Sequence, residues 1–146
     1  MENKEFKNLF NEIAKKNDFE SAFGGWFKES DECLAALYLQ KSHYGNYYEL
    51  NIKIFIQGIL GEYYKKGKEL KNAVSDILGR QPEEYRDVFD LELCIDYTLR
   101  KEKLERLFNE FIIPFVTSML TREGIKKQAM LDKDFLPPAV NKELGL

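Results

Sequence analysis

The side chain best suited to acid–base chemistry is His43, the only histidine in the chain. An imidazole titrates near neutral pH, so any mechanism that needs one must use His43. A Ser-His-acid triad on a hydrolase scaffold also needs a Gly-x-Ser-x-Gly turn, and this sequence has none. Cys33 is expected far from His43 on the same strand, which makes a Cys-His pair awkward. We therefore expect His43 to be a solvent-exposed turn residue.

Two carboxylates, Asp90 and Glu92, have the right chemistry for a divalent metal or for an acid–base pair. On an extended strand they would share one face about 7 Å apart, because each residue rises about 3.3 Å. Residues 83–96 contain six acidic side chains and one basic one, Arg86, which is typical of a solvated surface. A metal would need a third ligand, and the sequence identifies none. We favour the solvated surface and expect neither a metal nor a cofactor.

The charge balance argues against a nucleic-acid partner. The 146 residues have a formal net charge of −3, whereas nucleic-acid affinity rests on Lys and Arg neutralising phosphates. The stretch 49–53 resembles the acid-x-Lys strand of metal-dependent nucleases, but Asn51 stands where a carboxylate is required. Gly58 and Gly61 match a loop pattern of RNA-binding domains, yet they follow a strand and predict a simple turn.

The cysteines and the N-terminus indicate a reducing compartment. Cys33 and Cys94 are isolated from each other and lie in apolar runs, so both are expected to be small buried side chains. Residues 1–5 are charged and lack the pattern of a signal peptide. The apolar stretches are too short to span a membrane. We expect a soluble cytoplasmic protein without a membrane partner.

A β-hairpin is the clearest local structure in the sequence. Residues 33–41 are apolar on both faces in the middle, which predicts a central strand. Residues 47–57 alternate between apolar and polar side chains, which predicts a half-buried antiparallel strand. The connection 41–48 is rich in tyrosine and carries His43. A helix over 4–16, with Phe6, Leu9, Phe10 and Ile13 on one stripe, and a short strand over 26–29 precede the hairpin.

The second half of the chain predicts mainly helices. Apolar spacing favours a short helix over 69–78, and alternation favours a fourth strand over 88–96. A long helix capped by Thr98 follows, interrupted at Pro114, and Thr121 caps a further helix to Leu131. One more helical turn is expected in the C-terminal tail. These elements predict a single α+β domain over 1–146. It contains an antiparallel sheet of about four strands, with an N-terminal helix and a kinked C-terminal helical pair packed against it.

Several short motifs resemble one known family. They are Trp26-Phe27-Lys28, Leu39-Gln40-Lys41-Ser42, Tyr47-Tyr48-Glu49-Leu50-Asn51-Ile52, Arg80 with Pro82-Glu83-Glu84-Tyr85, and Ile113-Pro114-Phe115. Over 5–130 the chain resembles the bacterial domain of unknown function family 4304. The resemblance implies a small α+β bacterial protein with no settled activity, and it implies no catalytic residues. It makes Gln40, Lys41, Ser42 and Arg80 worth testing.

The sequence does not identify a reaction, and it favours binding over catalysis. Tyrosines gather in the 41–48 turn and acids gather in 83–96, a combination suited to contacting a protein partner. The candidate partner-binding or ligand-binding residues are Gln40, Lys41, Ser42, His43, Tyr44, Tyr47 and Arg80. We expect a non-catalytic binding or protein-interaction module, with neutralising proteins of the toxin-immunity type as one possibility. The alternative is a small-ligand-binding protein or enzyme with a polar pocket beside the hairpin, in which Lys41, His43 and Arg80 hold an anion or transfer protons.

Overall fold

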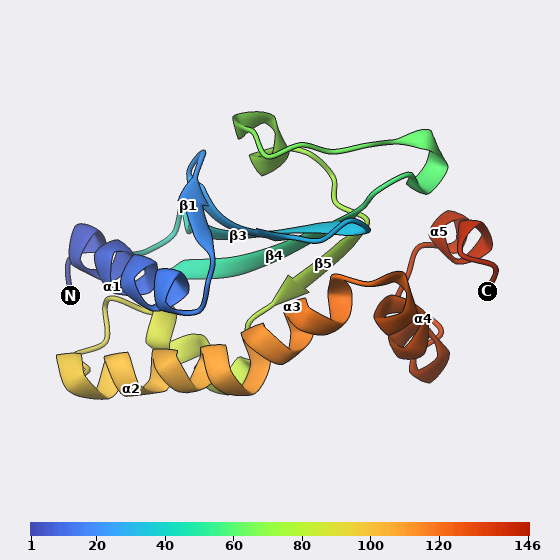
Figure 1. The fold of residues 1–146 in the computed structure, drawn as a ribbon. Helices are drawn as coiled ribbons and strands as arrows, with labels where there is room; N and C mark the ends of the chain where they lie inside the picture. Colours follow the sequence, from blue (N-terminus) through green and yellow to red (C-terminus); the bar gives the residue numbers. More distant parts are fainter.

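Five strands pair in chain order and antiparallel, so each strand is joined to its neighbour in the sheet by the next connection along the chain. The computed structural model describes all 146 residues (Figure 1). The helices and strands are α1 (Asn3–Lys16), β1 (Glu20–Ala22), β2 (Gly25–Glu29), β3 (Cys33–Lys41), β4 (Tyr48–Ile56), β5 (Ile77–Arg80), α2 (Tyr97–Leu107), α3 (Ile113–Met119), α4 (Arg122–Leu131) and α5 (Pro138–Glu143). The predicted α+β fold is confirmed, with five strands in place of about four.

One face of the sheet packs on helices and carries the main core. In Figure 1, α1 lies at one end of the sheet, and α2 continues into α3 beneath it. The alternating residues of β4 all point to this face, where Tyr48, Leu50, Ile52, Ile54 and Ile56 are buried. The predicted apolar stripe of α1 is buried against them. The apolar side chains that alternate along β4 and those that recur every three to four residues along α1 are thus buried in the same core.

The opposite face of the sheet, called the back face below, is covered over part of its area by residues 57–76. This segment crosses the sheet on the side away from α2 (Figure 1). A second, smaller core forms beneath it from Phe27, Leu34, Ala36, Tyr38, Phe55 and Leu70. Because β3 contributes to both cores, its apolar middle is explained by burial on two faces.

The C-terminal helices largely follow the predicted boundaries. A π-helical segment, Phe108–Ile112, joins α2 to α3, and Pro114, the second residue of α3, has no backbone N–H to donate. The Thr121 side chain accepts a hydrogen bond from the N–H of Gly124 at 3.0 Å, which confirms Thr121 as the cap of α4. The predicted cap of α2 is wrong. Thr98 lies inside the first turn, and Asp96 occupies the cap position.

The predicted helix over 69–78 is wrong. A short 3₁₀ turn, Lys68–Lys71, is followed by an irregular stretch and then by β5, which pairs with β4. The apolar side chains that suggested one helical stripe serve different surfaces. Leu70 enters the back-face core, Ile77 enters the main core, and Val74 is 91% exposed. Tertiary pairing therefore overrides the local spacing.

The predicted strand over 88–96 is also wrong. A 3₁₀ helix, Glu83–Phe89, leads into a turn, and only one isolated bridge, between Tyr47 and Asp90, joins this region to the hairpin. Alternation stops at Leu93, which is 44% exposed. Asp90 and Glu92 are therefore not neighbours on one face of a strand.

No helix of the structure combines the length and the apolar character needed to cross a membrane. The two cysteines differ in environment, because Cys33 is fully buried whereas Cys94 is exposed. The prediction that both are buried is wrong for Cys94, because the turn that replaces the expected strand leaves this side chain at the surface.

The two thiols are expected to react at very different rates. Burial raises the pKa of Cys33 to about 12, so Cys33 remains a protonated and inaccessible thiol at neutral pH. An aromatic disulfide reagent, which releases a coloured thiolate for each thiol that it modifies, should label only Cys94 in the native chain. It should label Cys33 only after denaturant has unfolded the protein. Equal labelling of both thiols in the native protein would contradict the burial of Cys33.

Candidate functional site

The tip of the β3–β4 hairpin projects from one end of the sheet. Lys41 pairs with Tyr48, and beyond them Ser42 N–H donates to the carbonyl of Tyr47 at 2.9 Å. The Ser42 hydroxyl accepts a hydrogen bond from Tyr44 N–H at 3.0 Å, which closes the turn locally. Tyr44 is 94% exposed and His43 is exposed. The expectation of an exposed turn histidine is confirmed.

Residues 83–96, called the acidic segment below, follow β5 and pack against this tip. Leu91 N–H donates to the carbonyl of Asn46 at 2.9 Å, beside the bridge between Tyr47 and Asp90. The Glu92 carboxylate lies over Gly45, where an added Cβ would be 2.7 Å from Glu92 Oε2. Two regions about 45 residues apart in sequence thereby form one surface. We call this the hairpin surface and define it by Tyr44, Gly45, Tyr47, Asp90 and Glu92.

A buried arginine holds the acidic segment in place. Arg100 of α2 is 0% exposed, and its guanidinium donates to the backbone carbonyls of Val88, Asp90 and Leu93 at 2.5, 3.3 and 3.0 Å. Burial lowers the pKa of Arg100, and the negative charges of Asp87 and Asp90 oppose that change. A single fork of donors thus satisfies carbonyls at the end of the 3₁₀ helix Glu83–Phe89 and in the turn that follows it.

A small cleft opens beside the hairpin surface, at the start of β4. Its volume is about 170 Å³, and it is lined by Tyr47, Tyr48, Glu49, Gln81, Arg86 and Asp90. Gln81 Oε1 accepts a hydrogen bond from Leu50 N–H at 2.9 Å, so the amide is oriented by the backbone of β4. Burial raises the pKa of Tyr48, which keeps its hydroxyl neutral. An engineered cavity of 150 Å³ holds benzene, so this cleft has room for one side chain or a comparably small molecule.

The predicted site residues separate into two groups. Lys41, Ser42, His43 and Tyr44 lie at or near the hairpin tip, and Tyr47 reaches the cleft.

Gln40 and Arg80 lie elsewhere, on the part of the back face that residues 57–76 leave open. Gln40 accepts a hydrogen bond from Asn51 at 2.8 Å, and Arg80 forms an ion pair with Glu49. Lys41, His43 and Arg80 therefore do not line the cleft together, and a shared anion-holding site for these three has no geometric support.

Metal binding at the carboxylates of this region also lacks a ligand set. The structure contains no group of three or more His, Cys, Asp or Glu side chains placed to hold a metal ion. Asp90 Oδ1 instead accepts the N–H of Glu92 at 3.0 Å, which stabilises the turn. The carboxylate of Asp90 therefore stabilises the backbone of the acidic segment, and the acidic side chains of this segment do not converge on a metal site.

Four residues that line or support the site were not singled out as site residues from the sequence: Glu49, Gln81, Arg86 and Arg100. A signal existed for Arg100, which lies four and seven residues before Leu104 and Leu107 and so shares their apolar stripe. Gln81 and Arg86 carry no such signal. Their position in the cleft depends on β5 and on the 3₁₀ helix that follows it.

Comparisons of the chain with protein-family models, with curated proteins and with solved structures found no match. The resemblance to family 4304 therefore stays a prediction.

Proposed function

We propose that this protein is a non-catalytic binding module that contacts a partner protein through the hairpin surface. The observation that carries the proposal is the docking of the acidic segment on the hairpin tip, through the Leu91–Asn46 hydrogen bond and the Tyr47–Asp90 bridge. It brings an almost fully exposed tyrosine, Tyr44, beside two carboxylates. Aromatic rings supply contact area at small entropic cost, and charges on the rim orient the partner.

The partner is expected to be basic where it meets this surface. Glu83, Glu84 and Glu92 are exposed, and Asp90 lines the cleft, whereas Arg86 is the only cation of residues 83–96. Charge complementarity would speed association and select against acidic proteins. A lysine or arginine side chain of the partner would fill the cleft and meet Asp90 beside the Tyr47 ring. Neutralisation of a basic protein, as immunity-type proteins achieve, is the form of this function that we favour.

The cleft also supports a second candidate, a small-ligand-binding protein or enzyme acting beside the hairpin. The supporting observation is the combination of an oriented amide, Gln81, with charges of both signs from Arg86 and Asp90. The volume of about 170 Å³ is below the 300–1,000 Å³ typical of small-molecule sites, so protein binding ranks first. We place either activity in the bacterial cytoplasm, without a nucleic-acid partner, cofactor or membrane.

Site-specific photo-crosslinking in the native host tests the proposal. A benzophenone amino acid replaces Tyr44, and the matched control carries it at Met130, which is 76% exposed in α4 at the other end of the sheet (Figure 1). We expect one discrete adduct with a basic protein from position 44 and none from position 130. Equal adducts from both positions, no adduct from position 44, or an adduct of twice the chain mass would contradict the proposal.

A further inference from the structure

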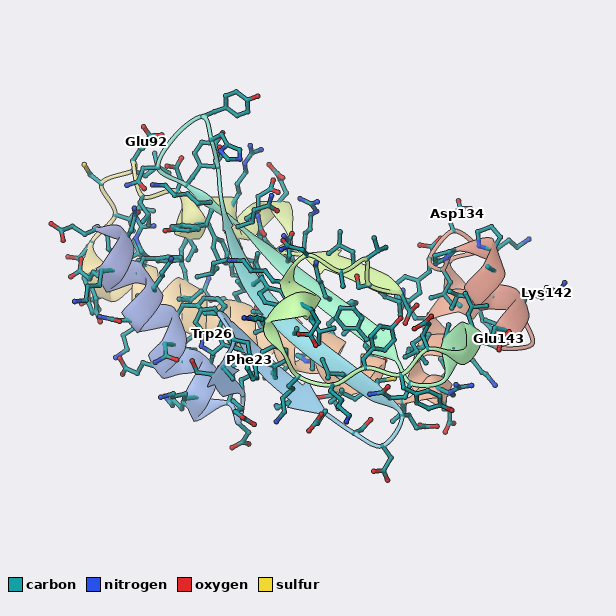
Figure 2. All side chains as sticks on the ribbon, turned by 90° about the horizontal axis from the view of Figure 1, so that it is seen from above. Phe23, Trp26, Glu92, Asp134, Lys142 and Glu143 are labelled. Atoms are coloured by element: carbon teal, nitrogen blue, oxygen red, sulfur yellow. The ribbon has the colours of Figure 1, made fainter.

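A second groove lies on a different part of the molecule, between α1 and the tip of the β1–β2 hairpin. Its volume is about 440 Å³, and its walls include Lys7, Asn11, Phe23, Trp26, Leu39 and Lys71. Figure 2 shows Phe23 and Trp26 close together beside α1. The volume falls within the range of small-molecule binding sites, and no step of the proposed partner binding uses this groove.

The groove presents positive charge and hydrogen-bond donors. Lys7 and Lys71 are its only charged residues, and no carboxylate lines it. Asn11 Oδ1 accepts the indole N–H of Trp26 at 2.9 Å, and the N–H groups of the same amide make no hydrogen bond within the chain. Asn8 and Ser21 add further polar groups. In a protein of net negative charge, this arrangement selects an anion.

The turn that forms one wall holds an aromatic residue in a strained conformation. Ala22 pairs with Gly25, so Phe23 and Gly24 form a two-residue turn, with φ values of +51° and +76°. Such turns favour Asn-Gly, because a bulky residue rarely adopts positive φ. The Phe23 ring is nevertheless 52% exposed. The Phe23 ring contacts Phe27 edge-on, with the ring centroids 6.4 Å apart, but this contact leaves about half of the residue exposed. A strained and half-exposed aromatic residue at the mouth of a groove is typical of a functional position.

We propose that this groove binds a small organic anion with a flat apolar body, such as an aromatic carboxylate or phosphate monoester. The rings of Phe23 and Trp26 contact the flat body, and Lys7 and Lys71 hold the anionic group. Leu39 of β3 adds an apolar side chain to the lining.

Trp26 is the only tryptophan, so its indole N–H gives a single reporter signal in the proton–nitrogen spectrum. Titration uses phenylacetate and phenyl phosphate as probes and phenylacetamide as the neutral match. We expect saturable shifts at Trp26 and around the groove, with at least about tenfold tighter binding of one anion than of the amide. Lys7→Gln with Lys71→Gln should remove that preference, whereas the exposed control Lys133→Gln should retain it. Equal binding of anion and amide, or no saturable shift, would overturn the proposal.

Phe23→Asn separates a binding role from a purely structural one. Asparagine tolerates the left-handed conformation, so this variant should raise the melting temperature by roughly 2–4 °C. The same variant should weaken binding of the preferred anion about tenfold, because the ring wall is lost. Unchanged binding by Phe23→Asn would remove Phe23 from the site and overturn the assignment of this groove.

Discussion

Replacing Arg100 by methionine is expected to lower the free energy of unfolding by about 3–5 kcal/mol. The side chain is 0% exposed and donates to the carbonyls of Val88, Asp90 and Leu93. Methionine fills similar space without donating, so these carbonyls lose a shared partner in a region that water reaches poorly. The predicted loss is a large part of the 5–15 kcal/mol by which most domains are stable.

Urea unfolding followed by far-ultraviolet circular dichroism measures this change. Arg86→Met is the matched control, because Arg86 is exposed and pairs only with Glu83, at 3.3 Å. The control should change the unfolding free energy by less than about 0.5 kcal/mol. Arg100→Lys keeps a positive charge but lacks the planar fork, and it should fall between the wild type and Arg100→Met. A loss below about 1 kcal/mol for Arg100→Met would show that the carbonyls find other partners.

The same substitution should loosen the hairpin surface. Asp90 and Glu92 depend on the turn that Arg100 closes, and that turn is otherwise joined to the hairpin through the Leu91–Asn46 hydrogen bond. Amide hydrogen exchange over residues 88–93 should accelerate more than exchange in β3 and β4. Stability and the geometry of the site are therefore linked through one side chain.

The elements predicted best from the sequence are those whose own periodicity matches their burial. Residues 48–54 alternate strictly, and their apolar set, continued by Ile56, is buried as one face of β4. The stripe of α1 and the cap of α4 are equally local signals, given by side-chain spacing and by Thr121. In each case the chain within one element contains the information that decides its structure.

The elements that were missed are decided by contacts between distant parts of the chain. β1 has only three residues, and it is a strand because it pairs with β2. Residues 69–78 have a helical spacing of apolar side chains, yet their last two residues begin β5, which pairs with β4 and places Ile77 in the main core. Residues 88–96 alternate like a strand. Their backbone instead forms a turn, because the carbonyls of Val88, Asp90 and Leu93 all accept hydrogen bonds from the buried Arg100. Local patterns do not contain these long-range partners.

The candidate site was predicted only in its hairpin half. The spacing around His43 and Tyr44 indicates an exposed turn, which the structure contains. The sequence also singled out the acidic segment as a separate surface. The two regions pack against each other through the turn that follows the 3₁₀ helix Glu83–Phe89, and Arg100 holds this turn in place. The combined surface therefore had to be read from the structure.

The second prediction is that Tyr44→Ser with Glu92→Lys weakens binding of the crosslinked partner about 100-fold. Tyr44 is 94% exposed and Glu92 is exposed, so the double variant should fold like the wild type. Loss of an aromatic anchor removes contact area, and a lysine in place of a glutamate repels a basic partner. The charge part of the effect should shrink as salt rises, because both charges are accessible to ions.

A matched double variant controls for the change in composition and charge. Tyr63→Ser with Glu143→Lys makes the same two changes at exposed positions away from the hairpin surface. Figure 2 shows Glu143 at the opposite end of the molecule from Glu92. This variant should bind the partner within about twofold of the wild type, because neither residue contacts the hairpin surface.

The most direct measurement is the dissociation constant of the crosslinked partner, determined by calorimetry for the wild type and for the two double variants. We predict a roughly 100-fold increase for Tyr44→Ser with Glu92→Lys and no more than about a twofold change for Tyr63→Ser with Glu143→Lys. Wild-type affinity in the first variant, or an equal loss in both, would contradict binding through the hairpin surface.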